Sequence, residues 1–125
     1  MLTAAGPRIA LAALALALTL LPEQALGQEI AILFERGDVA EGAAAFEAAC
    51  ASDDSLTLES LWTDIRGIAT PAELEEWETR PSTSRCALLE NMLAERAMLA
   101  GLTVPGRLAV HYQRLARARA DWGLR

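Results

Sequence analysis

The chain has 125 residues, of which 53% are hydrophobic, and a formal net charge of −6. This size allows one modest domain, and the acidic balance of a chain expected to be exported argues against nucleic acid as a partner. The charge is uneven: residues 28–95 hold 15 acidic residues against four arginines, whereas residues 96–125 hold six arginines against one aspartate. We expect either attraction between these two parts or a basic C-terminal helix that docks on an acidic partner.

Residues 1–27 have the layout of a signal peptide. A positively charged start precedes a run of Ile, Leu, Ala and Thr at 9–21, and Ala25 and Gly27 offer small side chains before a cleavage point. As a helix this run would be about 20 Å long, short of the roughly 30 Å hydrocarbon core of a membrane. We expect a mature chain that begins at Gln28, is periplasmic or secreted, and has no stable membrane span. A signal-anchored form is the alternative.

The chain has two cysteines, Cys50 and Cys86. In an oxidising compartment these two residues allow one intramolecular pairing, and the loop it closes would stabilise the fold by roughly 4 kcal/mol. We predict this disulfide. Two buried thiols, or a free cysteine that dimerises the chain, are the alternatives.

Beyond residue 28 the sequence predicts an all-α fold, a small bundle of five to six short helices. Ala, Leu, Glu and Arg dominate, and the alternation of β-branched residues typical of strands is absent. The predicted helices cover 29–35, 39–51, 56–68, 71–78, 84–100 and 105–122, with a polar break at 52–55 and a linker at 80–84. The clearest boundary is a capping box of Thr70 and Glu73 around Pro71, and Gly101 suits the end of a helix.

Helical spacing also predicts which apolar side chains face the core. The expected inward residues are Leu58, Leu61, Trp62, Ile65 and Ile68, then Leu74 and Trp77, then Cys86, Leu89, Met92, Leu93 and Leu99, and finally Leu108, Tyr112, Leu115, Ala118 and Trp122.

Residues 28–55 resemble one tetratricopeptide hairpin. The resemblance lies around the expected interhelical turn and second helix, in Gly37, Asp38, Val39, Gly42, Phe46 and Ala49. It implies that small residues let the two helices approach closely and that Phe46 fills the gap between them. A solenoid with a peptide groove needs at least three such units, so we interpret this single hairpin as a packing device.

A longer stretch is similar to the helical segment of bacterial GWxTD-domain proteins. The residues that carry the resemblance are 62–68, Ala69-Thr70-Pro71-Ala72-Glu73-Leu74, Glu76-Trp77-Glu78, 92–96 and 111–115. The chain has no Gly-Trp-x-Thr-Asp motif, and Leu93 and Ala97 stand where the family would have an aromatic residue and an acid. The resemblance implies a helical module on the exported side and no particular activity. We expect residues 56–125 to pack with the hairpin as one domain.

No catalytic, cofactor-binding or metal-binding residue is predicted, so we do not expect an enzyme. His111 is the single histidine and lies one turn from Leu108 and Leu115, which is typical of a partly buried structural residue. Without a second histidine, and with both cysteines paired, an ordinary zinc site cannot be assembled. The glutamates at 73–78 lack the Asp/Gly loop of a calcium site, and no glycine-rich phosphate loop is present.

The candidate interaction residues are Arg96, His111, Arg114, Arg117 and Trp122. Arg96 falls on or near a buried stripe, where its guanidinium needs either a carboxylate, such as Asp64 or a glutamate of the first helices, or a route to water. Alternatively it anchors a carboxylate of a partner. Arg114 and Arg117 share a helix face, and Trp122 either closes the core or stands exposed as an interface anchor.

These observations lead us to expect a non-enzymatic exported interaction or structural module of the bacterial cell envelope, with another envelope protein as its partner. The alternative is a periplasmic helical binder of a small amphipathic ligand. A partner module should show an exposed apolar patch rimmed by arginine, and a ligand binder should show an enclosed apolar cavity.

Overall fold

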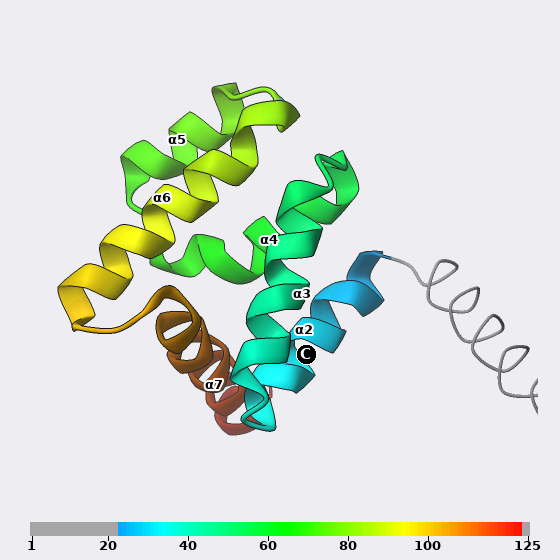
Figure 1. Cartoon of the computed structure of the whole chain (residues 1–125), viewed down its shortest axis with the longest axis vertical. Coiled ribbons are helices and arrows are strands. Elements are labelled where there is room, and N and C mark those ends of the chain that lie inside the picture. Colours follow the sequence, from blue (N-terminus) through cyan, green and yellow to red (C-terminus); the bar gives the residue numbers. More distant parts are fainter. Residues whose placement is uncertain (1–22, 124–125) are drawn as a thin grey trace, which may run out of the picture.

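The computed structural model describes residues 23–123, which form six α-helices and one short 3-10 helix (Figure 1). In chain order these are α2 (Glu23–Glu35), α3 (Val39–Ala51), α4 (Ser55–Ile65), η1 (Arg66–Ile68), α5 (Pro71–Thr79), α6 (Ser82–Ala100) and α7 (Val104–Trp122). No strand occurs within this range, so the all-α prediction is confirmed. Within the same range, every helix is too short or too polar to cross a membrane.

Short-range capping signals fix most of the helix ends. The Asp54 carboxylate accepts the Thr57 amide at 3.0 Å and begins α4. At the start of α5 the predicted capping box is present: the Glu73 amide donates to the Thr70 hydroxyl at 3.2 Å, and the Thr70 amide donates to the Glu73 carboxylate at 2.8 Å. Gly101 ends α6 in the left-handed conformation, with φ 69°. These boundaries were predictable because each depends on residues within one turn.

Three predicted boundaries were wrong. Helix α2 begins at Glu23 rather than at 29, and it passes through the expected cleavage point because nothing in its backbone ends a helix there. Helix α6 begins at Ser82, inside the predicted linker 80–84, because Pro81 starts its first turn and the Ser84 amide donates to the Pro81 carbonyl at 3.0 Å. The last turn of the third predicted helix is the 3-10 helix η1. Most of the predicted signal peptide, residues 1–22, lies outside the described residues.

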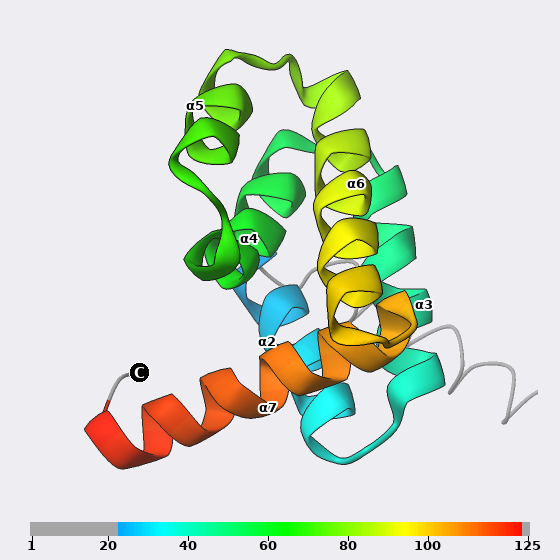
Figure 2. The same ribbon diagram turned by 90° about the vertical axis from the view of Figure 1, so that its left-hand side faces the viewer.

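The core draws side chains from α2, α3, α4, α5, α6 and α7. Its largest fully buried members are Trp77, Tyr112, Phe34, Ile30, Leu58, Leu61, Ile65, Leu89, Met92, Leu93 and Leu108. Aromatic pairs join distant elements: Phe34 stacks on Tyr112 at 5.1 Å between ring centroids, and Trp62 stacks on Trp77 at 4.4 Å. Helix α7 crosses the base of the bundle, and its C-terminal half runs out beyond the other helices (Figure 2).

The hairpin of α2 and α3 has a close approach at Gly42. A Cβ atom placed there would lie 3.0 Å from the Phe34 ring, so the absence of a side chain lets the two helices pack. Phe46, one turn further along α3, is buried in the core.

Three side chains predicted to face the core are exposed instead. Leu74 is 40%, Leu99 75% and Trp122 79% exposed. Helix α5 buries Trp77 alone, the end of α6 extends past the core, and Trp122 ends the part of α7 that leaves the bundle. Spacing correctly grouped residues on a helix face, but no second element covers these three.

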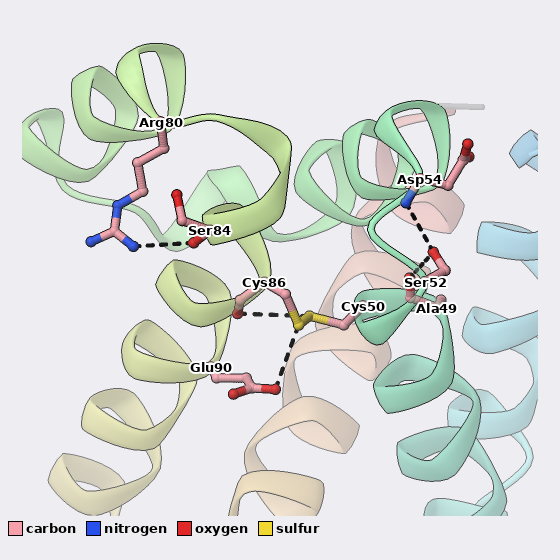
Figure 3. Close-up of a disulfide and its surroundings, with 8 residues drawn as sticks. All are labelled: Ala49, Cys50, Ser52, Asp54, Arg80, Ser84, Cys86 and Glu90. Atoms are coloured by element: carbon pink, nitrogen blue, oxygen red, sulfur yellow. Dashed lines mark hydrogen bonds between the residues drawn. A yellow bond between two sulfur atoms is a disulfide. The ribbon is translucent and has the colours of Figure 1, made fainter.

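The predicted disulfide joins Cys50 of α3 to Cys86 of α6 (Figure 3). The S–S bond is 2.00 Å long, and the two Cα atoms are 5.2 Å apart. This bond ties the hairpin to the second half of the chain, and neither cysteine of the sequence is left as a free thiol.

Candidate functional site

An open pocket of about 470 Å³ lies between the end of α6 and the first half of α7. It is lined by Arg96, Leu99, Ala100, Leu102, Arg107, Val110 and Arg114, and we call it the arginine pocket. The exposed side chains of Leu99 and Leu102 contribute its apolar part, and Met98 is exposed beside them in the sequence. An apolar surface next to three guanidinium groups is the pattern expected of a docking surface.

The chain reversal between α6 and α7 builds this pocket. After Gly101 the chain turns, and the Thr103 hydroxyl accepts the Gly106 amide at 3.1 Å to begin α7. Along α7, Arg107, Val110 and Arg114 are three and four residues apart, so they share one face. That face meets the last turn of α6 across the reversal.

Arg107 is the unusual residue of the pocket. It is only 9% exposed, and its Nη1 atom is buried without a hydrogen-bond partner. Burial, and then repulsion from Arg114 and Arg96, lowers the pKa of its guanidinium. A buried charged donor without an acceptor lowers the stability of the fold. An acceptor that reached the Nη1 group of Arg107 would therefore be bound favourably.

Arg96 is partly buried and has its acceptors within the chain. Its guanidinium pairs with the Glu73 carboxylate, and Nη2 also donates to the Ile68 carbonyl at 3.3 Å. Burial acts to raise the pKa of Glu73, but hydrogen bonds from Thr70 and Arg96 lower it below its ordinary value. The predicted need for a carboxylate is therefore met by Glu73 of α5, and the suggested partner Asp64 or a glutamate of the first helices was wrong.

The remaining candidate arginines differ in their surroundings. Arg114 and Arg117 are exposed and form no ion pair within the described part of the chain, but only Arg114 lines the pocket. Arg119 lies 3.9 Å from the Asp64 carboxylate. The pocket therefore presents two unpaired cations, one buried and one exposed.

His111 lies in the interface between α7 and α4 and does not line the pocket. It is 5% exposed, and its Nε2 donates to the Asp64 carbonyl at 2.6 Å, while the Tyr112 hydroxyl donates to the Asp64 carboxylate at 3.0 Å. Burial lowers the pKa of His111 and raises the pKa of Asp64 and of Tyr112. Through its hydrogen bond to the Asp64 carbonyl, the buried His111 side chain joins α7 to α4. Trp122 stands exposed, far along α7 from Arg114.

Arg107 was missed among the predicted interaction residues, although a signal was present. It precedes the core residue Leu108 directly and stands one turn before His111, so the stripe that buries those two side chains also draws in Arg107. In the sequence, Arg107 is one of the six arginines of residues 96–125, and its charge alone does not distinguish it from the others.

One cluster has the composition of a metal site. The ligand atoms of Cys50, Cys86 and Glu90 lie within 4.8 Å of one another. Both sulfur atoms are bonded to each other, so neither offers the thiolate that a metal ion requires. In the disulfide state this donor set does not fit a metal.

Comparisons with protein-family models, curated proteins and solved structures find no match. The resemblances to tetratricopeptide and GWxTD-domain proteins stay predictions.

Proposed function

We propose that this protein is a non-enzymatic, exported interaction module of the bacterial cell envelope. In this proposal the arginine pocket binds an acidic, apolar segment of a partner envelope protein. The observation that carries the proposal is Arg107, a lining residue of an open pocket whose buried Nη1 atom has no hydrogen-bond acceptor. The disulfide is compatible with an exported chain.

A partner carboxylate would match the charge of the pocket. Arg107 and Arg114 are both without an ion pair within residues 23–123, and a hydrogen bond to an ionised acceptor is about twice as strong as a neutral one. Leu99 and Leu102 would contact the apolar side chains that flank the carboxylate in the partner. An arginine surrounded by apolar contacts is typical of the residues that dominate binding energies.

The composition of the pocket supports binding rather than catalysis. Its lining consists of arginine and aliphatic side chains, without a histidine, carboxylate, hydroxyl or thiol. Such a site can hold and neutralise an anion, but it offers neither a nucleophile nor a group that accepts a proton near neutral pH. The alternative function, binding of a small amphipathic ligand, is supported by a separate cavity.

The test compares two labelled peptides on the disulfide-bonded protein by fluorescence polarisation. One alternates Leu with Glu and the other alternates Leu with Gln. We expect the acidic peptide to bind about tenfold more tightly, because it supplies the missing acceptor. Arg107→Met should remove most of that difference, while Arg117→Met, which removes an exposed cation of the same helix outside the pocket, should change it less than about twofold.

Equal losses in the two variants would contradict the proposal, because the attraction would then come from the net charge of α7 alone. Binding of both peptides with the same affinity would also contradict it. Far-UV circular dichroism and thermal unfolding establish that each variant keeps its helices.

A further inference from the structure

A second cavity, of about 280 Å³, lies between α3, α6 and the amino end of α7. It shares no lining residue with the arginine pocket. Its wall is mainly apolar and includes Phe46 of α3, Leu93 of α6 and Leu108 of α7. Glu47 and Glu90 complete the lining, and none of the lining residues is basic.

The two carboxylates lie on the same side of the disulfide. Glu47 stands one turn before Cys50, and Glu90 stands one turn after Cys86. Because α3 and α6 run in opposite directions (Figure 1), both steps lead away from the disulfide toward the same end of the helix pair. Cys50 of the disulfide lines the cavity on one side, and the first residues of α7 line it on another.

Neither carboxylate is neutralised within the described residues. No ion pair involves Glu47 or Glu90 there. Figure 3 shows Glu90 pointing toward the disulfide, with a carboxylate oxygen 3.5 Å from the Cys86 sulfur. A disulfide sulfur carries no hydrogen, so this contact does not offset the negative charge.

The amino end of α7 lines the cavity through Val104 and Pro105, and the amide groups that follow are engaged. Pro105 has no N–H group, the Gly106 amide donates to the Thr103 hydroxyl at 3.1 Å, and the Arg107 amide donates to the Thr103 carbonyl at 2.9 Å. The two glutamates therefore set the charge that a bound group would meet.

From this geometry we propose that the cavity binds a small amphipathic cation, an organic ammonium ion with a short hydrocarbon or aromatic body. The body contacts Phe46, Leu93 and Leu108, and the ammonium group lies between Glu47 and Glu90. A cavity that combines an apolar wall with a few polar groups has the composition typical of a small-ligand site. The site is independent of the partner-binding proposal and selects the opposite charge.

The test uses three probes of similar shape on the disulfide-bonded protein: phenethylammonium, the neutral 2-phenylethanol and the anionic 3-phenylpropanoate. Dissociation constants come from NMR titrations that follow Phe46 and Leu108. We expect the cation to bind about tenfold more tightly than the alcohol, and the anion to bind most weakly. Glu47→Gln combined with Glu90→Gln should bring the cation to the affinity of the alcohol.

The matched control is Glu41→Gln combined with Glu78→Gln, which removes the same charge from exposed positions outside the cavity. It should retain the preference for the cation. Equal affinity of the cation and the alcohol for the unchanged protein, or the same loss in both double variants, would overturn the proposal. Absence of binding by any probe up to about 20 mM would overturn it as well.

Discussion

The guanidinium groups of Arg96 and Arg107 both line the arginine pocket, yet only Arg96 has a carboxylate partner. The carboxylate of Glu73 and the carbonyl of Ile68 accept from Arg96, whereas the Nη1 atom of Arg107 has no acceptor. Removing one member of a buried ion pair leaves the other charge without a partner and lowers stability. Removing a buried charge that has no partner eliminates its unfavourable desolvation energy. The two arginines should therefore respond to the same substitution with opposite signs.

Arg107→Met should raise the free energy of unfolding by up to about 1 kcal/mol, because methionine fills a similar volume without a charge. Arg96→Met should lower it by about 1–3 kcal/mol, because Glu73 and the Ile68 carbonyl lose their donor. Urea unfolding followed by circular dichroism measures both values. A loss of stability in Arg107→Met as large as that in Arg96→Met would show that Arg107 is satisfied in solution.

His111 should make the stability of the protein depend on pH in the slightly acidic range. Burial lowers the pKa of His111 in the folded state below its ordinary value of 6.5. Below about pH 6.5 His111 binds a proton in the unfolded chain but remains neutral in the folded chain. The free energy of unfolding is therefore highest above this pH and decreases as the pH falls. We expect the Tm to be a few degrees lower at pH 5.5 than at pH 7.5.

The variant His111→Gln keeps a donor for the Asp64 carbonyl but cannot titrate, so its Tm should change much less between these two pH values. Asp64 acts with the opposite sign. Burial raises its pKa above the ordinary value of 3.8, so the folded state takes up that proton first, and its contribution to stability decreases as the pH rises above about 3.8. An unchanged pH response in the glutamine variant would show that another group is responsible.

At the scale of elements, the contact between α2 and α3 depends on the lack of a side chain at Gly42. Gly42→Ala would place a Cβ atom 3.0 Å from the buried Phe34 ring, and we expect it to lower the free energy of unfolding by about 1–3 kcal/mol. Gly67→Ala is the control, since nothing lies within 4 Å of its added Cβ atom. It should be neutral or stabilising by up to about 1 kcal/mol. Similar thermal unfolding of both variants would contradict this view of the hairpin.

The elements themselves were largely predictable from the sequence, because caps and periodicity are local. Thr70 and Gly101 mark helix ends through contacts within one turn. The exposure of Leu99 depends instead on whether another helix covers its face, and periodicity carries no such information. For the same reason Arg107 was missed and Arg96 was assigned the wrong acceptors: both depend on how α5, α6 and α7 meet in space.

For the molecule as a whole, the disulfide should be a major source of stability. It joins residues 36 apart in sequence, and its removal in the Cys50→Ala/Cys86→Ala variant should lower the free energy of unfolding by about 2–4 kcal/mol. Urea unfolding with and without reductant measures the effect. Reductant should destabilise the unchanged protein by a similar amount and leave the variant unaffected. A variant as stable as the oxidised protein would show that packing alone holds α3 against α6.

The same disulfide also determines the outcome of proteolytic cleavage between Cys50 and Cys86. The exposed bend at 52–54 lies between Cys50 and Cys86, so a single cut there would leave two pieces still joined through sulfur. The nicked molecule would keep both halves of its core in contact and would migrate as one species until reductant separated them. In a compartment that contains proteases, a molecule cut at this segment would therefore keep its two pieces together for as long as the disulfide is oxidised.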